Sequence, residues 1–451
     1  MKKVITLLSM IVFVIIQTQA QTLDPTFGAS GKVGPFLNGF TPSKYDKAMV
    51  VDASGKILIA GSSNGRFAVM RLNSDGSSDN TFGSNGLAEI NKPGLAAEAV
   101  AIQSDGKIIL AGYKQAGQGN DAYDIEAIRL NTDGTTDDTF GSNGVQIITI
   151  TNDDKAFSVI VQPDDKIVIG GYVNTAPNLF DASTDDFIVL RLTATGPLDG
   201  SFNSVGYKVI DFAGDNDMAR TLAIDGNGKI LIGGKARVDA VTNWDFAIAR
   251  INTDGSFDNS FSGDGKQTIS LTFSNDEIKS IAVQADGNIV LAGLGANGSN
   301  NDYEIARLAG SDGSLDAGFD GDGKKLIDFN SAEDDAACVL IKQDGKILVS
   351  GNTFNGTNDD FGIVCLNVDG TLDNGFGTGG KYQLDFSNGY DLGNSMRLQA
   401  DGKLLVGNNV ADNAGYHAGI FRLALSPGTD CSITGPNQLC NGAPSIAYNG
   451  P

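Results

Sequence analysis

Residues 99–144 read AVAIQSDGKIILAGYKQAGQGNDAYDIEAIRLNTDGTTDDTFGSNG and contain the unit from which most of the chain is built. Short apolar runs alternate with turns, and the Asp-Gly turn at residues 105–106 stands between two of these runs. Asp-Gly between apolar runs is a strong signal for a β-hairpin, because glycine accepts a positive φ. The unit therefore predicts four antiparallel strands. A sheet that is apolar on both faces must stack on further copies of itself.

The unit recurs seven times, and its most regular marker is the phenylalanine of the DDTFGSNG signature. Successive signature phenylalanines are 55 to 62 residues apart, at Phe27, Phe82, Phe140, Phe202, Phe261, Phe319 and Phe376. Four-stranded units with two apolar faces can stack radially into a closed ring. We therefore predict an all-β fold, a seven-bladed β-propeller of four-stranded antiparallel blades. The alternative is a linear β-solenoid, which would need capping units that this sequence lacks.

The two ends of the repeat region predict how the ring closes. The last unit ends after its third strand, near Arg422, and no signature follows it. A signature and a fourth strand stand instead near the N-terminus, in residues 23–37 (LDPTFGASGKVGPFL). We predict that this N-terminal strand completes the last blade, which also removes an exposed sheet edge.

Arginines of the third strands and aspartates of the signatures are expected to form buried ion pairs across the second turn. Both faces of a blade are covered, and a buried charge needs a partner. The pairs expected from the spacing are Arg71 with Asp79, Arg129 with Asp137, Arg191 with Asp199, Arg250 with Asp258, and Arg307 with Asp316. Arg422 has no aspartate after it, so we predict that Asp24 pairs with it from the far end of the chain. Unit six has Cys365 in place of arginine, which leaves Asp373 to find another donor or face water.

The recurring pattern LDxxFGxxGK, DGKIxxAG and FxxxRLNxDG resembles the delta-60 repeat of secreted bacterial proteins, over residues 23 to about 424. The chain is also similar, more loosely, to the NHL type of propeller repeat. The resemblance implies a β-propeller fold and no defined activity.

The ends of the sequence lie outside the repeats. Residues 1–20 combine two lysines, an apolar core and a small-residue cleavage site, which predicts a signal peptide and a secreted or cell-surface protein. The propeller is expected to span residues 21–425. Residues 426–451 are interpreted as a linker and the start of a truncated immunoglobulin-like or similar surface module, in which Cys431 and Cys440 could pair. Cys338 and Cys365 are expected to be buried and unpaired, because one strand would separate them.

The net charge of −22 argues against binding of nucleic acid or anionic lipid, since both would repel an acidic surface. It is compatible with cations, basic partners and neutral glycans, or simply with solubility outside the cell. No second apolar segment is long enough to predict a membrane span.

No catalytic residue is predicted. The chain has one histidine, His417, with no partner motif beside it, so it is interpreted as a loop residue. The sequence also contains no zinc motif, P-loop or dinucleotide fingerprint, and no cofactor is expected apart from calcium.

Five aspartates form the candidate cation site. Each stands eleven residues before the glycine position of a first hairpin: Asp154, Asp217, Asp276, Asp334 and Asp391. We expect them on the links into the inner strands, around one mouth of the central channel, where clustered carboxylates would bind Ca²⁺. The alternative is that each carboxylate caps its own link by accepting backbone hydrogen bonds.

The variable loops between second and third strands are the expected place for a glycan or protein ligand, because rigid scaffolds present binding residues on loops. The longest spans residues 173–186 and contains Asp181 and Asp185. Trp244 begins a third strand in the next unit, where it would either stack on a glycan or pack against a neighbouring blade.

These features predict a non-catalytic binding or display scaffold. One alternative is a polysaccharide hydrolase or lyase that uses carboxylates at the channel mouth. An enzyme should break the repeat with unique polar residues facing the channel, and we expect the residues near the channel to follow the repeat. The other alternative is a structural spacer in a longer surface protein.

Overall fold

The computed structural model describes residues 21–425 apart from short gaps, at residues 37–38, 92–95, 117–121, 152, 177–183, 213–215, 238–242, 272–274, 297, 299, 387–388 and 413–414. The predicted signal peptide, the predicted C-terminal module with Cys431 and Cys440, and Asp181 lie outside the described residues. Within the described part, no helix is long and apolar enough to cross a membrane.

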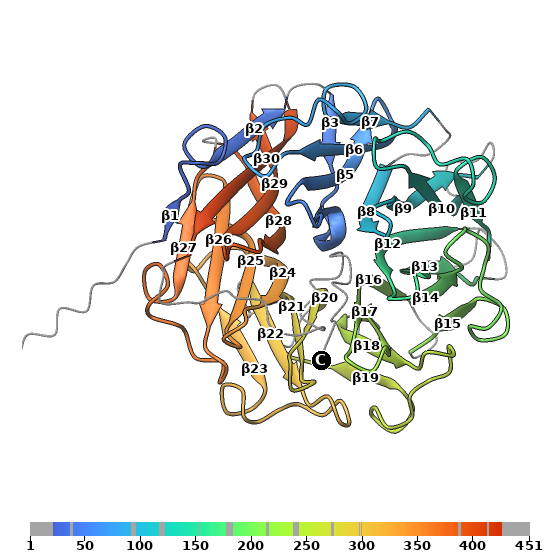
Figure 1. Cartoon of the computed structure of the whole chain (residues 1–451). Coiled ribbons are helices and arrows are strands. Elements are labelled where there is room, and N and C mark those ends of the chain that lie inside the picture. The colour runs from blue at the N-terminus through green and yellow to red at the C-terminus, as the bar shows by residue number, and fades with distance from the viewer. Residues whose placement is uncertain are drawn as a thin grey trace, which may run out of the picture.

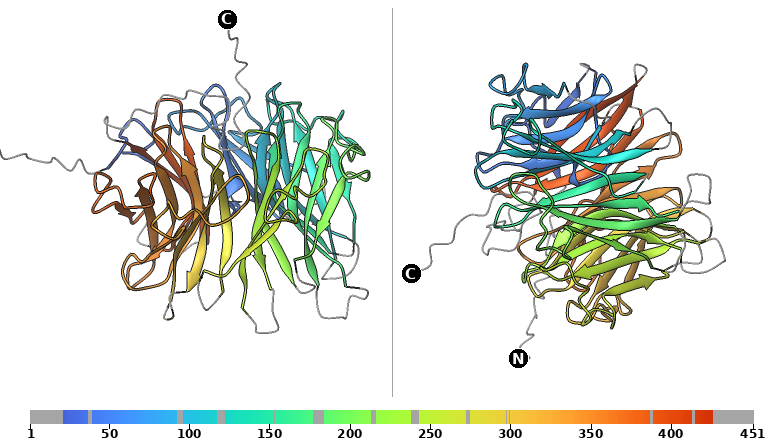
Figure 2. Two further views of the ribbon diagram at one scale, coloured as in Figure 1. Left: turned by 90° about the horizontal axis from the view of Figure 1, so that it is seen from below. Right: turned by 90° about the vertical axis from the view of Figure 1, so that its right-hand side faces the viewer.

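Seven antiparallel sheets, built from the described residues, surround a central axis (Figure 1). In most blades the strands follow one another from the axis outward in chain order, as in β12-β13-β14-β15. The apolar clusters span neighbouring blades, and the signature phenylalanines, including Phe140 and Phe202, are fully buried in them. Side views show the blades stacked face to face around the ring (Figure 2). The predicted seven-bladed propeller is therefore confirmed.

The strand bounds repeat from blade to blade. Blades one to three contain β3 (Phe40–Pro42), β4 (Met49–Val51), β5 (Ile57–Ser63), β6 (Arg66–Leu72) and β7 (Leu87–Glu89); β8 (Ala96–Ile102), β9 (Ile108–Gln115), β10 (Tyr123–Leu130) and β11 (Val145–Ile148); and β12 (Asp154–Val161), β13 (Ile167–Asn174), β14 (Asp185–Leu192) and β15 (Tyr207–Ile210). Blades four to six contain β16 (Asp217–Ile224), β17 (Ile230–Ala236), β18 (Asp245–Ile251) and β19 (Lys266–Ile269); β20 (Glu277–Val283), β21 (Ile289–Ala296), β22 (Asn301–Leu308) and β23 (Lys324–Ile327); and β24 (Asp334–Ile341), β25 (Ile347–Phe354), β26 (Asp359–Leu366) and β27 (Lys381–Leu384). Blade seven contains β28 (Asp391–Leu398), β29 (Leu404–Asp412) and β30 (Gly415–Ala424), completed by β1 (Thr22–Leu23) and β2 (Lys32–Phe36).

The ring closes between the two ends of the repeat region, as predicted. Both β1 and β2 pair antiparallel with β30, with Thr22 opposite Ala424 and Lys32 opposite Phe421. The Asp24 N–H also donates to the Arg422 carbonyl (2.8 Å). The outer edge of the last blade is thus covered by a segment from the start of the chain.

A β-bulge interrupts the inner strand of blades two to seven. In blade three it lies between Ala156 and Ser158, where one extra residue, Phe157, faces the partner strand β13. A side chain at Gly171 of β13 would overlap the Lys155 carbonyl oxygen, so only glycine lets the two backbones approach this closely. This requirement explains the glycine in the repeated apolar run of the second strand (LAGY, IGGY, IGGK).

The inner strand of blade one is built differently from the others. Between β3 and β4 the chain forms a short 3-10 helix, η1 (Asp46–Ala48), which lies among the inner strands (Figure 1). The Asp46 carboxylate accepts hydrogen bonds from Thr221 of β16 (3.1 Å) and Ser280 of β20 (2.9 Å), and its carbonyl accepts one from Ser395 of β28 (2.9 Å). These partners belong to blades four, five and seven. η1 therefore braces the ring across its centre, a feature that the repeat pattern did not predict.

Candidate functional site

The structure brings together all six expected Arg–Asp pairs. Each contact runs from arginine Nε to aspartate Oδ2, at 2.7 Å for Arg71 and Asp79, 2.8 Å for Arg129 and Asp137, 2.8 Å for Arg191 and Asp199, 2.6 Å for Arg250 and Asp258, 2.8 Å for Arg307 and Asp316, and 2.8 Å for Arg422 and Asp24. In each unit the guanidinium also lies over the signature phenylalanine and donates to a backbone carbonyl, as Arg191 does to Thr253 of blade four (2.6 Å). The pairs therefore join blades and are structural.

Blade six lacks the arginine and keeps only the lysine, which contacts the signature aspartate in other blades too, as Lys166 contacts Asp199 (3.4 Å). Lys346 Nζ lies 2.7 Å from Asp373 Oδ2, and Cys365 Sγ lies 3.7 Å from the same oxygen. Cys365 and Cys338 are buried and free. Blade six thus has an ion pair within the blade but lacks the arginine that would donate to a carbonyl of the next blade.

The five candidate aspartates do not share one site. Asp154, Asp217, Asp276, Asp334 and Asp391 are all fully buried at the starts of inner strands, and each accepts a backbone hydrogen bond from its own link, as Asp217 does from Phe212 (2.7 Å). The alternative, in which each carboxylate caps its own link, is therefore confirmed for all five, and no two of them belong to the same carboxylate cluster among the described residues. Asp154 also accepts a hydrogen bond from the Thr151 hydroxyl of its own link (2.5 Å).

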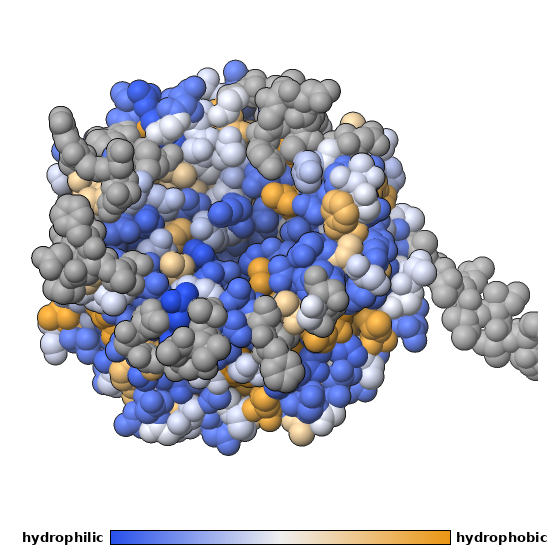
Figure 3. All heavy atoms as spheres, turned by 180° about the vertical axis from the view of Figure 1, so that it is seen from behind, coloured by the Kyte–Doolittle hydropathy of each residue, from blue (hydrophilic) through white to orange (hydrophobic). Residues whose placement is uncertain are grey.

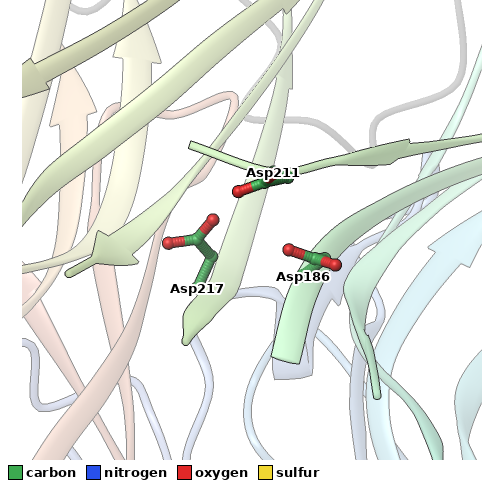
Figure 4. Close-up of side chains that lie close together, drawn as sticks. All are labelled: Asp186, Asp211 and Asp217. Carbon is green, nitrogen blue, oxygen red and sulfur yellow. The ribbon is translucent and has the colours of Figure 1, made fainter. Parts of the chain in front are cut away.

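Three of these aspartates complete a carboxylate triad between blades. The triads are Asp186, Asp211 and Asp217; Asp302, Asp328 and Asp334; and Asp360, Asp385 and Asp391, each with one carboxylate oxygen per residue within 4.8 Å of the others. Figure 4 shows the first triad, in which the three carboxylates surround a common space. In each triad two members are buried and the middle one is exposed.

The electrostatics of a triad disfavour three negative charges. Burial raises the pKa of Asp217 to about 7. The charges of Asp186 and Asp211 also raise it, whereas the hydrogen bond from the Phe212 N–H lowers it. Burial likewise raises the pKa of Asp334 to about 7. The sequence analysis missed the triads, although a signal was present: aspartate recurs five residues before the third-strand arginine and directly after the fourth strand.

A second cluster combines the residue before η1 with residues on inner and second strands of blades two to four, and we call it the channel-mouth cluster: Tyr45, Tyr113, Phe157, Tyr172 and Arg220. The Phe157 ring centroid is 4.7 Å from that of Tyr45, 6.0 Å from that of Tyr113 and 5.5 Å from that of Tyr172. The Arg220 guanidinium lies 5.2 Å from the Phe157 centroid. Figure 3 views the ring from the side on which the inner strands begin, and this face is hollowed at its centre.

Charged side chains surround these rings. Arg220 Nε lies 2.6 Å from Glu277 Oε1, and Lys155 Nζ lies 4.4 Å from the Tyr123 centroid and 3.1 Å from Asp153 Oδ2. Burial raises the pKa of Glu98, which accepts a hydrogen bond from Ser43 Oγ (2.8 Å).

The channel residues do not follow the repeat, contrary to expectation. The bulged inner-strand position differs in every blade from two to seven, as Glu98, Phe157, Arg220, Lys279, Ala337 and Asn394. The bulge places these side chains beside one another across blades, as the contact between Phe157 and Arg220 shows. The inner strands therefore depart from the repeat at the channel. A single ligand site in a ring of repeats would need such unique residues.

The other candidate ligand residues are not members of this cluster, although Lys235, which lies over Trp244, contacts Glu277, the partner of Arg220. Trp244 is half-buried under two cations, with Lys235 Nζ 4.8 Å and Arg237 Cζ 5.0 Å from its ring. Asp185 is buried and accepts a hydrogen bond from Asn174 Nδ2 (2.9 Å). His417 lies on β30, five residues before Arg422, where three other blades have a triad aspartate.

Comparisons with known proteins bear on the fold. A family model described as "Domain of unknown function (DUF5122) beta-propeller" matches six segments, at residues 53–82, 103–140, 162–202, 226–261, 284–319 and 342–376. These segments contain the second and third strands and the signatures of blades one to six. No curated protein is found to match this sequence.

Solved structures with a similar fold include enzymes. A polysaccharide lyase described as an ulvan lyase of family PL25 is 11% identical, with a TM-score of 0.53 over 87% of this chain and 95% of that one. Virginiamycin B lyase from Staphylococcus aureus is 12% identical, with a TM-score of 0.50 over 88% of this chain and 98% of that one. At these identities the likeness shows the propeller fold alone.

Proposed function

We propose that the chain is a secreted or cell-surface binding scaffold, without catalytic activity, that holds a glycan at the channel mouth. The observation that carries the proposal is the channel-mouth cluster itself, where aromatic rings from three blades meet in a part of the ring that departs from the repeat. Aromatic faces stack against the C–H faces of sugar rings, and tyrosine adds a hydroxyl to the apolar surface. Phe157 is only 3% exposed, so an oligosaccharide would contact the half-buried Tyr45, Tyr113 and Tyr172 that pack on it.

The charges around the cluster favour a neutral or weakly charged glycan. Arg220 and Lys235 both contact Glu277, at 2.6 and 3.3 Å, and Lys279 contacts Asp335 (2.5 Å). Because these cations are already paired, they contribute little net attraction for a strongly anionic polymer. The proposed ligand therefore binds mainly through stacking and hydrogen bonds.

A glycan array probed with the purified chain tests this function. Binding to a defined set of neutral oligosaccharides is expected, and the double variant Tyr113→Ala/Tyr172→Ala should lose it. Tyr390→Ala is the matched control, because Tyr390 is 49% exposed and lies outside the cluster. A chain that binds no glycan contradicts the proposal and favours a structural spacer. Binding that survives the double variant contradicts the channel mouth as the glycan site.

Two observations favour the enzyme as a second candidate. Unique polar residues, among them Glu98, Arg220 and Lys279, break the repeat at the channel, which is the pattern expected of an enzyme. Glu98 is buried beside Ser43 and Tyr113 with a raised pKa, which suits a general acid or base. A polysaccharide hydrolase or lyase would use it on a glycan in the channel mouth. Product formation by the purified chain that Glu98→Gln abolishes, with binding retained, would establish this alternative over the scaffold.

A further inference from the structure

We propose that the three carboxylate triads are calcium sites, each holding one ion that links two neighbouring blades. The first joins blades three and four, the second blades five and six, and the third blades six and seven. The calcium sites are independent of the glycan proposal.

One carboxylate of the first triad has a buried oxygen without a hydrogen-bond partner. Asp217 is fully buried; one carboxylate oxygen accepts the Phe212 N–H, and the other, Oδ1, has no hydrogen-bond partner. Figure 4 shows the Asp217 carboxylate turned toward Asp186 and Asp211. An unpaired buried carboxylate oxygen costs free energy, which a cation between the three residues would offset.

The same feature recurs in the other two triads. Oδ1 of Asp334 and Oδ1 of Asp360 are also buried without a partner, and both residues are at least nine-tenths buried. The nearby lysines serve the backbone: Lys266 donates to the carbonyl of Asp211 (2.8 Å) and Lys32 to that of Asp385 (3.1 Å). Each triad therefore contains one buried oxygen without a partner, on the inner-strand aspartate in the first two and on the third-strand aspartate Asp360 in the third.

The corresponding position between blades two and three shows how the chain fills the gap without a cation. There Thr149 stands where Asp211 stands in the first triad, and its hydroxyl donates to Asp124 Oδ1 (2.7 Å). Ser270 occupies the equivalent position between blades four and five. A hydroxyl supplies an internal donor, whereas a third carboxylate supplies only another acceptor and a negative charge.

The chemistry of the triad selects calcium. Calcium binds six to eight oxygens at about 2.3–2.6 Å, so two oxygens on one ion lie at most about 5 Å apart. The triad oxygens lie within 4.8 Å of one another, and three carboxylates provide the hard anionic ligands that calcium prefers. The exposed middle aspartate leaves one side open, where water completes the coordination.

Calcium titration of the chelator-treated, full-length chain is the test, with CaCl₂ as the probe in calorimetry and thermal melting. We expect saturable binding of three ions and a rise in melting temperature. The triple variant Asp211→Thr/Asp328→Thr/Asp385→Thr, which copies the Thr149 position, should lose both. In chelator it should melt above the unmodified chain, because it removes the repulsion within each triad.

The matched control replaces three exposed turn aspartates, Asp105→Asn/Asp286→Asn/Asp401→Asn. It changes the net charge equally and should bind three ions as before. Absence of binding heat and of a shift in melting temperature at millimolar CaCl₂ overturns the proposal. The carboxylates of each triad would then be held together by shared protons. Calcium binding that survives in the threonine variant overturns it as well, since the ions would then lie elsewhere.

Discussion

The substitution Asp24→Asn tests whether the ring depends on one ion pair between the ends of the repeat region. Asp24 is 4% exposed and accepts hydrogen bonds from Arg422 Nε (2.8 Å), Lys403 Nζ (3.1 Å) and the Thr26 hydroxyl (2.7 Å). Asparagine keeps the shape and one acceptor for Thr26. It presents a neutral amide to the two cations, so the charged contacts are lost without a cavity.

The expected cost follows from these contacts. The buried hydrogen bond to Arg422 contributes about 1.5–3 kcal/mol, and the contact with the partly exposed Lys403 adds at most about 1 kcal/mol, so the total is about 2–4 kcal/mol. Asp24 lies on a segment that has no further blade before it. We therefore expect the loss to appear as local opening of residues 21–36 and of β30, with exchange there roughly 30- to 1,000-fold faster.

Hydrogen exchange followed by mass spectrometry measures this opening, and Asp199→Asn is the matched control. Asp199 has the same kind of contacts inside blade three, with Arg191 Nε at 2.8 Å and Lys166 Nζ at 3.4 Å. The control should leave exchange of residues 21–36 unchanged. If residues 21–36 exchange as slowly in Asp24→Asn as in the unmodified chain, the pair of Asp24 and Arg422 does not secure the closure of the ring.

Three further predictions concern the repeat. Burial raises the pKa of Asp199, but hydrogen bonds from Ser201 and nearby cations outweigh it and hold the pKa at about 2. The stabilisation from this carboxylate is therefore present above about pH 4 and is lost as pH falls toward 2. Chemical denaturation across this range should show that Asp199→Asn loses less unfolding free energy in acid than the unmodified chain does. Cys365→Arg should restore the missing pair with Asp373 and raise the melting temperature, and an unchanged or lower value counts against the pair as an inter-blade fastener. Gly171→Ala should place a methyl group on the Lys155 carbonyl and cost about 2 kcal/mol or more in urea unfolding, whereas tolerance would mean that the bulge relaxes.

The fold could be predicted because the residues that a blade needs for its turns and buried contacts recur in every repeat. Asp-Gly turns fix the hairpins, and the absence of a signature after Arg422 identifies the strand that must come from elsewhere. The Arg–Asp spacing was informative for the same reason, since the antiparallel turn brings residues eight apart into contact, as in Arg191 and Asp199. Each of these relations is local within a unit or a direct consequence of closing the ring.

The candidate sites were harder because they form between units. Asp186, Asp211 and Asp217 lie up to 31 residues apart and meet only when two blades pack, so no single repeat shows the triad. The sequence did identify Asp217 and its equivalents, but assigned them to one ring. The bulge at Phe157 adds a second difficulty, because an extra residue alters which side chains face the axis.

The mouth of the channel departs from the repeat around η1. Asp46 bonds to blades four, five and seven, and the preceding residue, Tyr45, packs on Phe157 of blade three. The hydroxyls that meet Asp46 occupy equivalent positions directly after the bulge, whereas the bulged residues beside them differ from blade to blade. Arg220 illustrates this, since it lies one residue before an Asp46 contact, Thr221, and its guanidinium is 5.9 Å from the Tyr45 ring. The packing between blades is thus regular while the bulged positions around η1 are unequal, and the proposed glycan site lies at these unequal positions.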